Sequence, residues 1–260
     1  MSFKYVVTFS MDEYVGIEKC PPPRRFIGGN LAGLTGRRIG RSHPQSYHHY
    51  MFEHFYRHID ISPPNVNVLD GNAVDLDAEC ARYEEKMSAV GGVNLFVGST
   101  GPDGHIGFNE PGSSLQSRTR VKTPAHATVM EMLPSFENDI ECVPKRALTV
   151  GIGTFMDARE ECKHADRTWS SHSGANPPQV MVVMTTTRKA KALCRCIEEG
   201  VTHMSPVSAI QLHKKAVVVC DDDATLDLRV RTVRYFKGLE GLHNELLVPA
   251  KKRKLPEEGS

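Results

Sequence analysis

The sequence has 260 residues, a formal net charge of +1, 40% hydrophobic residues and 24% charged residues. This balance is typical of a globular protein, and the near-neutral charge argues against nucleic acid or an acidic membrane as partner. No run of eighteen apolar residues occurs, and the first residues carry no apolar leader, so neither a membrane span nor a secretory signal is predicted.

The cysteines predict a reducing compartment. There are seven of them, an odd number, and they are scattered without a CxxC pair. This pattern disfavours both a disulfide framework and a zinc site. We therefore expect free thiols and a cytoplasmic location.

The N-terminal half of the chain alternates apolar runs with helical spacings. A strand is predicted over 4–9, ending at the polar cluster 10–14, and 18–42 is an irregular insert rich in Pro and Gly. The elements expected next are a helix around Tyr47–Phe55, a strand at 66–69, a helix at 75–90 and a strand at 93–97.

The C-terminal half continues this alternation after a polar stretch at 112–146, where no strand is predicted. Strands are expected at 147–150, 180–184 and 216–220, and helices at 187–199 and 224–239. A second irregular insert occupies 160–179, and 246–260 is expected to be a disordered basic tail. Because several strands are apolar throughout, residues 1–245 are predicted to form one α/β domain whose mainly parallel sheet is covered on both faces.

The residues whose type and spacing favour chemistry lie directly after the apolar run 93–97. The loop GPDGHIGFNEP at 101–111 places Asp103, His105 and Glu110 within eight residues. Asp12 follows the strand at 4–9, and the ends of parallel strands meet at one sheet edge, so these groups are expected to converge. An imidazole between carboxylates can move protons near neutral pH. The simpler alternatives are that Asp12 caps a helix or turn and that 101–104 is only a tight turn.

Other clusters give weaker signals. Five histidines, at positions 43, 48, 49, 54 and 58, resemble metal ligands by number, but their spacing favours a solvated helix face, and no metal site is predicted. The turn at 151–154 offers backbone amides to an anion on a weak GxG pattern. Arg188 and Lys189 could meet a phosphate, or could be ordinary solvated charges on a helix.

Several motifs together resemble the glucosamine-6-phosphate deaminase family, in its animal-type form. They are MDEYVG at 11–16, HPQSY at 43–47, GPDGHIGFNEP at 101–111, SRTRVKT at 117–123, ALTVGIGT at 147–154 and QLH at 211–213. The resemblance covers about four fifths of the chain. It implies a doubly wound, Rossmann-like fold. It also implies an enzyme that converts glucosamine 6-phosphate and water to fructose 6-phosphate and ammonia without metal or organic cofactor.

The resemblance also implies roles for individual residues. Asp12 would be the base that moves a proton between C2 and C1 of the open-chain sugar. His105 would help to open the sugar ring, with Asp103 and Glu110 tuning and orienting it. Lys189 would bind the substrate phosphate, and 124–144 would form a lid over the site.

Regulation and assembly are implied by the same resemblance. Ser113, Arg120, Lys122 and Thr123 match positions that bind the effector N-acetylglucosamine 6-phosphate in hexameric members, so a homo-oligomer is expected. The sequence lacks the family's first strand–helix unit with its phosphate loop, and Pro134 stands where the lid has a phosphate-binding arginine.

Two alternatives remain open at this stage. A phosphogluconolactonase-like hydrolase could share the fold, although lactone hydrolysis does not need the base that Asp12 would supply. A catalytically impaired paralogue could instead act by binding subunits of a longer deaminase.

Overall fold

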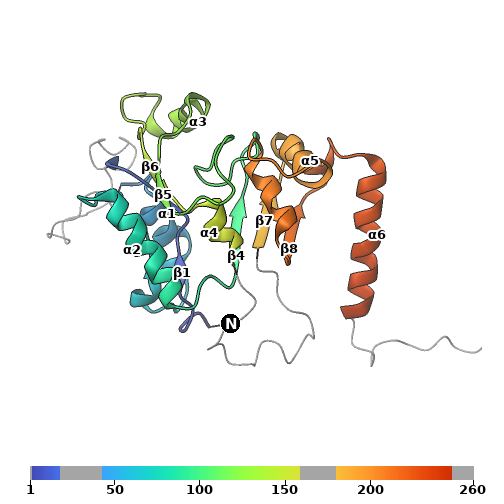
Figure 1. Ribbon diagram of the computed structural model, residues 1–260, viewed down its shortest axis with the longest axis horizontal. Helices are drawn as coiled ribbons and strands as arrows, with labels where there is room; N and C mark the ends of the chain where they lie inside the picture. Colours follow the sequence, from blue (N-terminus) through green and yellow to red (C-terminus); the bar gives the residue numbers. More distant parts are fainter. Residues whose placement is uncertain (1, 18–42, 159–179, 248–260) are drawn as a thin grey trace, which may run out of the picture.

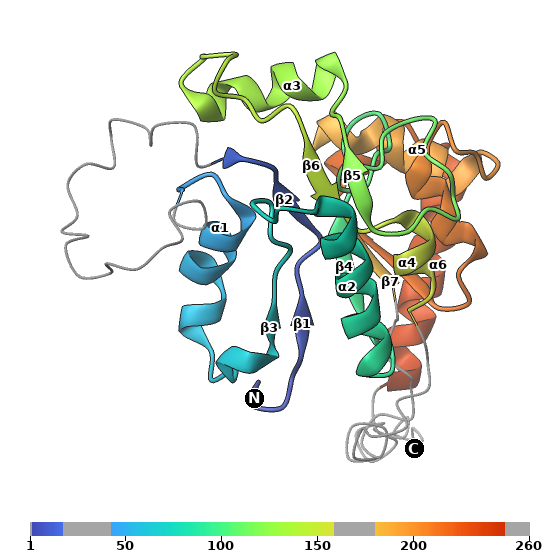
Figure 2. The same cartoon turned by 60° about the vertical axis from the view of Figure 1, so that its left-hand side comes forward.

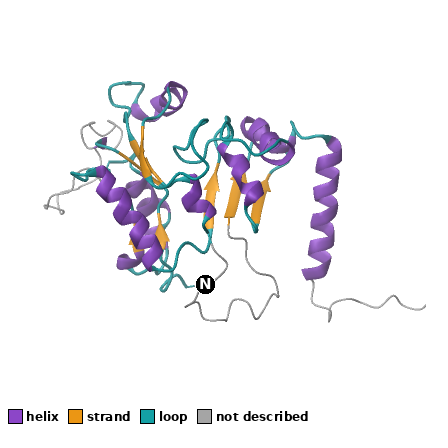
Figure 3. Ribbon diagram, in the orientation of Figure 1, coloured by secondary structure: helices purple, strands orange, loops and turns teal. Residues whose placement is uncertain are grey.

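Helices flank a set of mainly parallel strands in the described part of the chain (Figure 1). The computed structural model describes residues 2–17, 43–158 and 180–247. The predicted inserts at 18–42 and 160–179, and the tail beyond residue 247, lie outside the described residues. Figure 3 shows the strands in the interior and helices on their flanks, which confirms the mainly parallel α/β fold class.

The largest parallel sheet has the order β4-β7-β8. Its strands are β4 (Phe96–Ser99), β7 (Val180–Met184) and β8 (Ala216–Cys220). Alternate side chains of β7 are fully buried against α4 (Ile152–Met156) and α5 (Ala190–Glu198). The opposite face is more open than predicted, because Val97, Val217 and Val219 are exposed and α6 (Val230–Leu247) stands to one side of β8 (Figure 1).

A second parallel pair joins β1 (Thr8–Phe9) to β3 (Val66–Asn67) (Figure 2). Helix α2 (Leu76–Ala89) secures this pair through the buried Tyr83, whose hydroxyl donates to the carbonyls of Ser10 at 2.8 Å and Asn67 at 3.1 Å. A buried tyrosine needs such partners for its polar end. The N-terminus of α2 is capped by Asp75, which accepts from the amides of residues 77 and 78.

An antiparallel sheet, β2-β6-β5, lies between these parts. Its strands are β2 (Asp12–Tyr14), β6 (Ala147–Thr149) and β5 (Arg120–Lys122). Two sequence expectations were wrong here: Asp12 and Glu13 form a strand of their own, and the polar stretch 112–146 contains β5. Both strands are three residues long, which is too short for a periodic apolar pattern. They form because each pairs with β6, a contact that depends on tertiary context.

The remaining helices surround this antiparallel sheet. Helix α1 (Tyr47–His54) is capped by Ser46, whose side chain accepts from the amide of His49 at 3.0 Å. Helix α3 (His126–Met132) projects beyond β5 and β6 at the top of Figure 1. Short 3-10 turns complete the structure at Tyr56–His58, Pro63–Asn65, Leu133–Phe136, Thr187–Lys189, Pro206–Leu212 and Asp223–Thr225.

Candidate active site

The loop after β4 is built around glycines. A Cβ on Gly101 would lie 2.1 Å from the His105 ring, and Gly104 has φ +92°, a conformation that favours glycine. The Gly101 amide donates to the His105 carbonyl at 3.0 Å, which closes the loop around the imidazole. The loop is therefore shaped to hold His105 and is more than a tight turn.

His105 is held by Asp103. Its Nδ1 lies 2.6 Å from Oδ1 of Asp103, and its backbone amide donates to the same oxygen at 3.1 Å. Burial lowers the pKa of His105, but the hydrogen bond and charge of Asp103 outweigh burial, so the net pKa is raised. Burial raises the pKa of Asp103, yet its bonds to His105 outweigh that effect and lower the net value. The pair is thus an oriented imidazole poised to gain a proton.

Asp12 is a buried carboxylate on β2. Burial raises its pKa from 3.8 to about 7, although the Thr149 hydroxyl and the His105 charge both lower it. Thr149 donates to Oδ1 of Asp12 across the β2–β6 ladder, where the two residues are in register. A carboxyl group with a pKa near 7 can both accept and return a proton at neutral pH.

The structure brings Asp12 and the 101–110 loop together, as predicted. A Cβ on Gly107 would lie 2.9 Å from Oδ2 of Asp12, so the loop backbone passes directly over the carboxylate. The charge of His105 is close enough to Asp12 to lower the pKa of that carboxyl group. The expected geometry differs in one respect: Asp12 reaches the site from an antiparallel strand, not from the end of a parallel one.

Glu110 is buried but directs its carboxylate toward the start of α3. It accepts from the Ala125 amide at 2.8 and 3.0 Å and from the Thr128 hydroxyl, both at the start of α3. Its charge contributes to the raised pKa of His105, behind the larger effects of burial and Asp103. Glu110 therefore connects the loop to α3, while Asp103 supplies the direct contact that orients His105.

Lys189 lies at the carboxyl end of β4. Its Nζ donates to the Ser99 hydroxyl at 2.5 Å, next to the strand end from which the His105 loop departs. Burial, and then the charge of Arg188, lower the pKa of Lys189. A cation at the carboxyl ends of parallel strands is placed where anionic ligands bind in open α/β sheets.

The four residues expected at an effector site are spread along one segment. Ser113 is buried, and its hydroxyl has no hydrogen-bond partner in the described structure. Arg120 and Lys122 lie on β5, and Thr123 follows that strand. Arg120 lies in register with Thr149, the residue that also faces Asp12 across the sheet.

Comparisons with known proteins place this geometry in a family. The chain is 50% identical over 249 residues to mouse glucosamine-6-phosphate deaminase 2, a match that covers 96% of this chain and 75% of the relative. It is 51% identical to human glucosamine-6-phosphate deaminase 1, covering 72% of that protein. The chain belongs to the glucosamine-6-phosphate deaminase family.

Solved structures agree with this membership. A monomeric glucosamine-6-phosphate deaminase superposes with a TM-score of 0.67 at 31% identity, covering 87% of this chain and 76% of that one. A 6-phosphogluconolactonase from Trypanosoma cruzi superposes with a TM-score of 0.51 at 17% identity. The match covers 72% of this chain and 67% of the lactonase, and it shows a shared fold alone. No protein-family model matches the chain.

Two residues of this deaminase-family site were missed by the sequence analysis. Thr149 was placed in a strand but given no role, because its contact with Asp12 depends on strand register. Glu13, rather than Asp12, assists the cap residue Ser46: it accepts from the amides of Tyr47 at 3.2 Å and His48 at 2.9 Å at the start of α1. The alternation of β2 separates these two neighbouring carboxylates into a site residue and a cap.

The weaker candidates fare differently. The amides of Ile152 and Gly153 donate to Ser117, and a Cβ on Gly151 would lie 2.0 Å from the Ser117 carbonyl. The turn at 151–154 therefore packs against the chain, and the anion interpretation was wrong.

Within residues 2–17, 43–158 and 180–247, no group of three His, Cys, Asp or Glu residues is arranged to hold a metal. In the same residues, no helix is both long and apolar enough to cross a bilayer.

Replacing Thr149 with valine should raise the pKa of Asp12 above its present value of about 7. The variant keeps the shape of the side chain and removes the hydroxyl that lowers that pKa. Loss of this bond should also destabilise the fold by about 1–3 kcal/mol at pH values where Asp12 is charged. Carboxyl-carbon NMR titration measures the pKa. Thr154→Val removes a hydroxyl bonded to Glu84 at 2.6 Å and serves as the control. An unchanged Asp12 titration in Thr149→Val would contradict this account.

Proposed function

We propose that this chain is a glucosamine-6-phosphate deaminase, converting glucosamine 6-phosphate and water to fructose 6-phosphate and ammonia. The observation that carries the proposal is the buried Asp12 carboxylate, with a pKa of about 7, beside the His105–Asp103 pair. Family membership at about 50% identity supports the same substrate.

The chemistry requires two kinds of proton transfer. The pyranose ring must open before the C2 hydrogen becomes acidic, and an imidazole oriented by Asp103 can carry protons between sugar oxygens. Asp12 then removes the C2 proton and returns it to C1. This transfer leaves an imine at C2, to which water adds, and ammonia departs as the ketose forms.

The phosphate is assigned to Lys189 at the carboxyl end of β4. Charge-assisted hydrogen bonds of this kind contribute about 1.5–3 kcal/mol each.

The segment 124–144 is proposed as the lid, because α3 is joined to Glu110 and packs against Tyr14 on the Asp12 strand. Movement of α3 would therefore be transmitted to the catalytic loop through Glu110.

We further propose a cytoplasmic location, since all five described cysteines are free thiols. Binding of N-acetylglucosamine 6-phosphate to Ser113, Arg120, Lys122 and Thr123, in a homo-oligomer, is proposed on the family resemblance. The buried, unpartnered hydroxyl of Ser113 supports a ligand near that residue.

A second candidate function is the binding of longer deaminase subunits. The exposed valines of the β4-β7-β8 sheet favour it, because an apolar sheet face is stabilised by a packed helix layer. Light scattering and a turnover assay, each applied to the chain alone and mixed with a longer family member, separate the two functions. A stable mixed complex without turnover would support subunit binding, and turnover by the unmixed chain would refute it.

Asp12→Asn should abolish most of the activity. The amide cannot take the C2 proton, so a loss of about 10²–10⁴-fold in kcat is expected. In the wild type, activity should rise with pH through about 7, because Asp12 acts as a base only after losing its proton. A coupled assay for fructose 6-phosphate measures both effects. The exposed Asp77→Asn is the matched control, and retention of full activity by Asp12→Asn would refute the assignment.

A further inference from the structure

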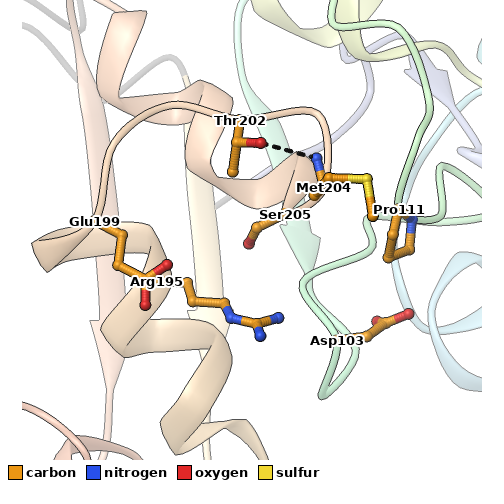
Figure 4. A pocket seen from close by; sticks show the side chains of 7 residues that line it. All are labelled: Asp103, Pro111, Arg195, Glu199, Thr202, Met204 and Ser205. Atoms are coloured by element: carbon orange, nitrogen blue, oxygen red, sulfur yellow. Dashed lines mark hydrogen bonds between the residues drawn. The ribbon is translucent and has the colours of Figure 1, made fainter.

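A hollow of about 320 Å³ lies beside the catalytic loop and shares with the proposed active site only Asp103, the residue that orients His105 (Figure 4). Its walls come from the loop that carries Asp103 and Pro111, from Arg195 on α5, and from Glu199, Met204 and Ser205 after α5. Neither Asp12, His105 nor Lys189 lines it. Its volume is within the range of pockets that bind small molecules.

The hollow contains a buried hydroxyl that lacks a partner. Ser205 is 2% exposed, and its Oγ has no hydrogen-bond partner in the described structure. Figure 4 shows this oxygen directed into the hollow. A buried polar group without a partner is destabilising, so a ligand hydroxyl that bonds Ser205 would be stabilising.

The charged groups define what else the ligand carries. The Arg195 guanidinium extends across the hollow toward Asp103 (Figure 4), and no ion pair of Arg195 occurs among the described residues. Its five donors match a phosphate or carboxylate. On the opposite wall, Asp103 uses Oδ1 for both bonds to His105, which leaves Oδ2 to accept from a ligand hydroxyl.

We propose that this hollow binds a small hydroxylated anion, of the class of phosphorylated or carboxylated sugars. The acid group would bind Arg195, hydroxyls would bind Ser205 and Asp103, and the carbon skeleton would lie against Pro111 and Met204. Asp103 and Glu199 would repel an anion without hydroxyl donors, and Arg195 would repel a cation. The combination therefore selects a ligand with both features.

The position of the hollow couples its occupancy to His105. A Cβ on Gly104 would lie 2.5 Å from the Ser205 hydroxyl, and the Val207 amide donates to the Gly104 carbonyl at 2.9 Å. Gly104 lies between Asp103 and His105 in the chain. A ligand that bonds to Ser205 and Asp103 would thus contact both supports of the imidazole, as an effector would.

The test uses the full chain in a Lys189→Ala background, so that the proposed active-site lysine does not contribute to phosphate binding. Calorimetric titration compares glucose 6-phosphate, inorganic phosphate and sorbitol as probes. Arg195→Leu and Ser205→Ala are the test variants. Lys191→Leu, an exposed lysine on the same helix, is the matched control, and unfolding midpoints verify that each variant is folded.

Glucose 6-phosphate should bind more tightly than either phosphate or sorbitol. Arg195→Leu should weaken binding by about 10- to 100-fold, the equivalent of one lost charge-assisted contact. Ser205→Ala should weaken glucose 6-phosphate binding more than phosphate binding, and Lys191→Leu should change neither. Absence of binding, or equal binding by Arg195→Leu and Lys191→Leu, would overturn the proposal. The result does not depend on turnover, so it stands apart from the proposed deaminase activity.

Discussion

The hydrogen bond between Thr149 and Asp12 is the contact on which the proposed chemistry depends. Burial alone would disfavour a charged Asp12 strongly, and the Thr149 hydroxyl offsets part of that effect, leaving a pKa of about 7. The bond exists because β2 and β6 are paired in antiparallel register, with Asp12 opposite Thr149. The titration behaviour of the site is therefore a consequence of strand pairing in a sheet of very short strands.

That small sheet is held in place by packing on both sides. Leu148 and Val150 join a cluster with Tyr83 and Met87 of α2, whereas Ala147 and Tyr14 join a cluster with Phe136, which follows α3. Neighbouring residues of β6 thus contact α2 on one side and the segment around α3 on the other. Since Glu110 also bonds the start of α3, the proposed lid is connected both to Asp12 through its strand and to the His105 loop.

Much of this architecture was predictable from the sequence, and the exceptions have physical reasons. The apolar strands at 180–184 and 216–220 were found at the predicted residues, because continuous β-branched runs are strong signals. The loop at 101–110 was identified from its glycines and polar groups. The short strands β2 and β5 were not predicted, since three residues carry no recognisable period. Neither the role of Thr149 nor the contacts of Glu110 with the start of α3 could be inferred, because both depend on residues distant in sequence.

The central claim is that Asp12 carries a proton between neighbouring carbon atoms of the sugar. Turnover of glucosamine 6-phosphate deuterated at C2 tests this most directly, with NMR or mass detection of deuterium at C1 of the fructose 6-phosphate formed. The account predicts that deuterium from C2 appears at C1 for the wild type and that this transfer is strongly reduced in Asp12→Asn. Wild-type product without deuterium at C1, or undiminished transfer in Asp12→Asn, would contradict it.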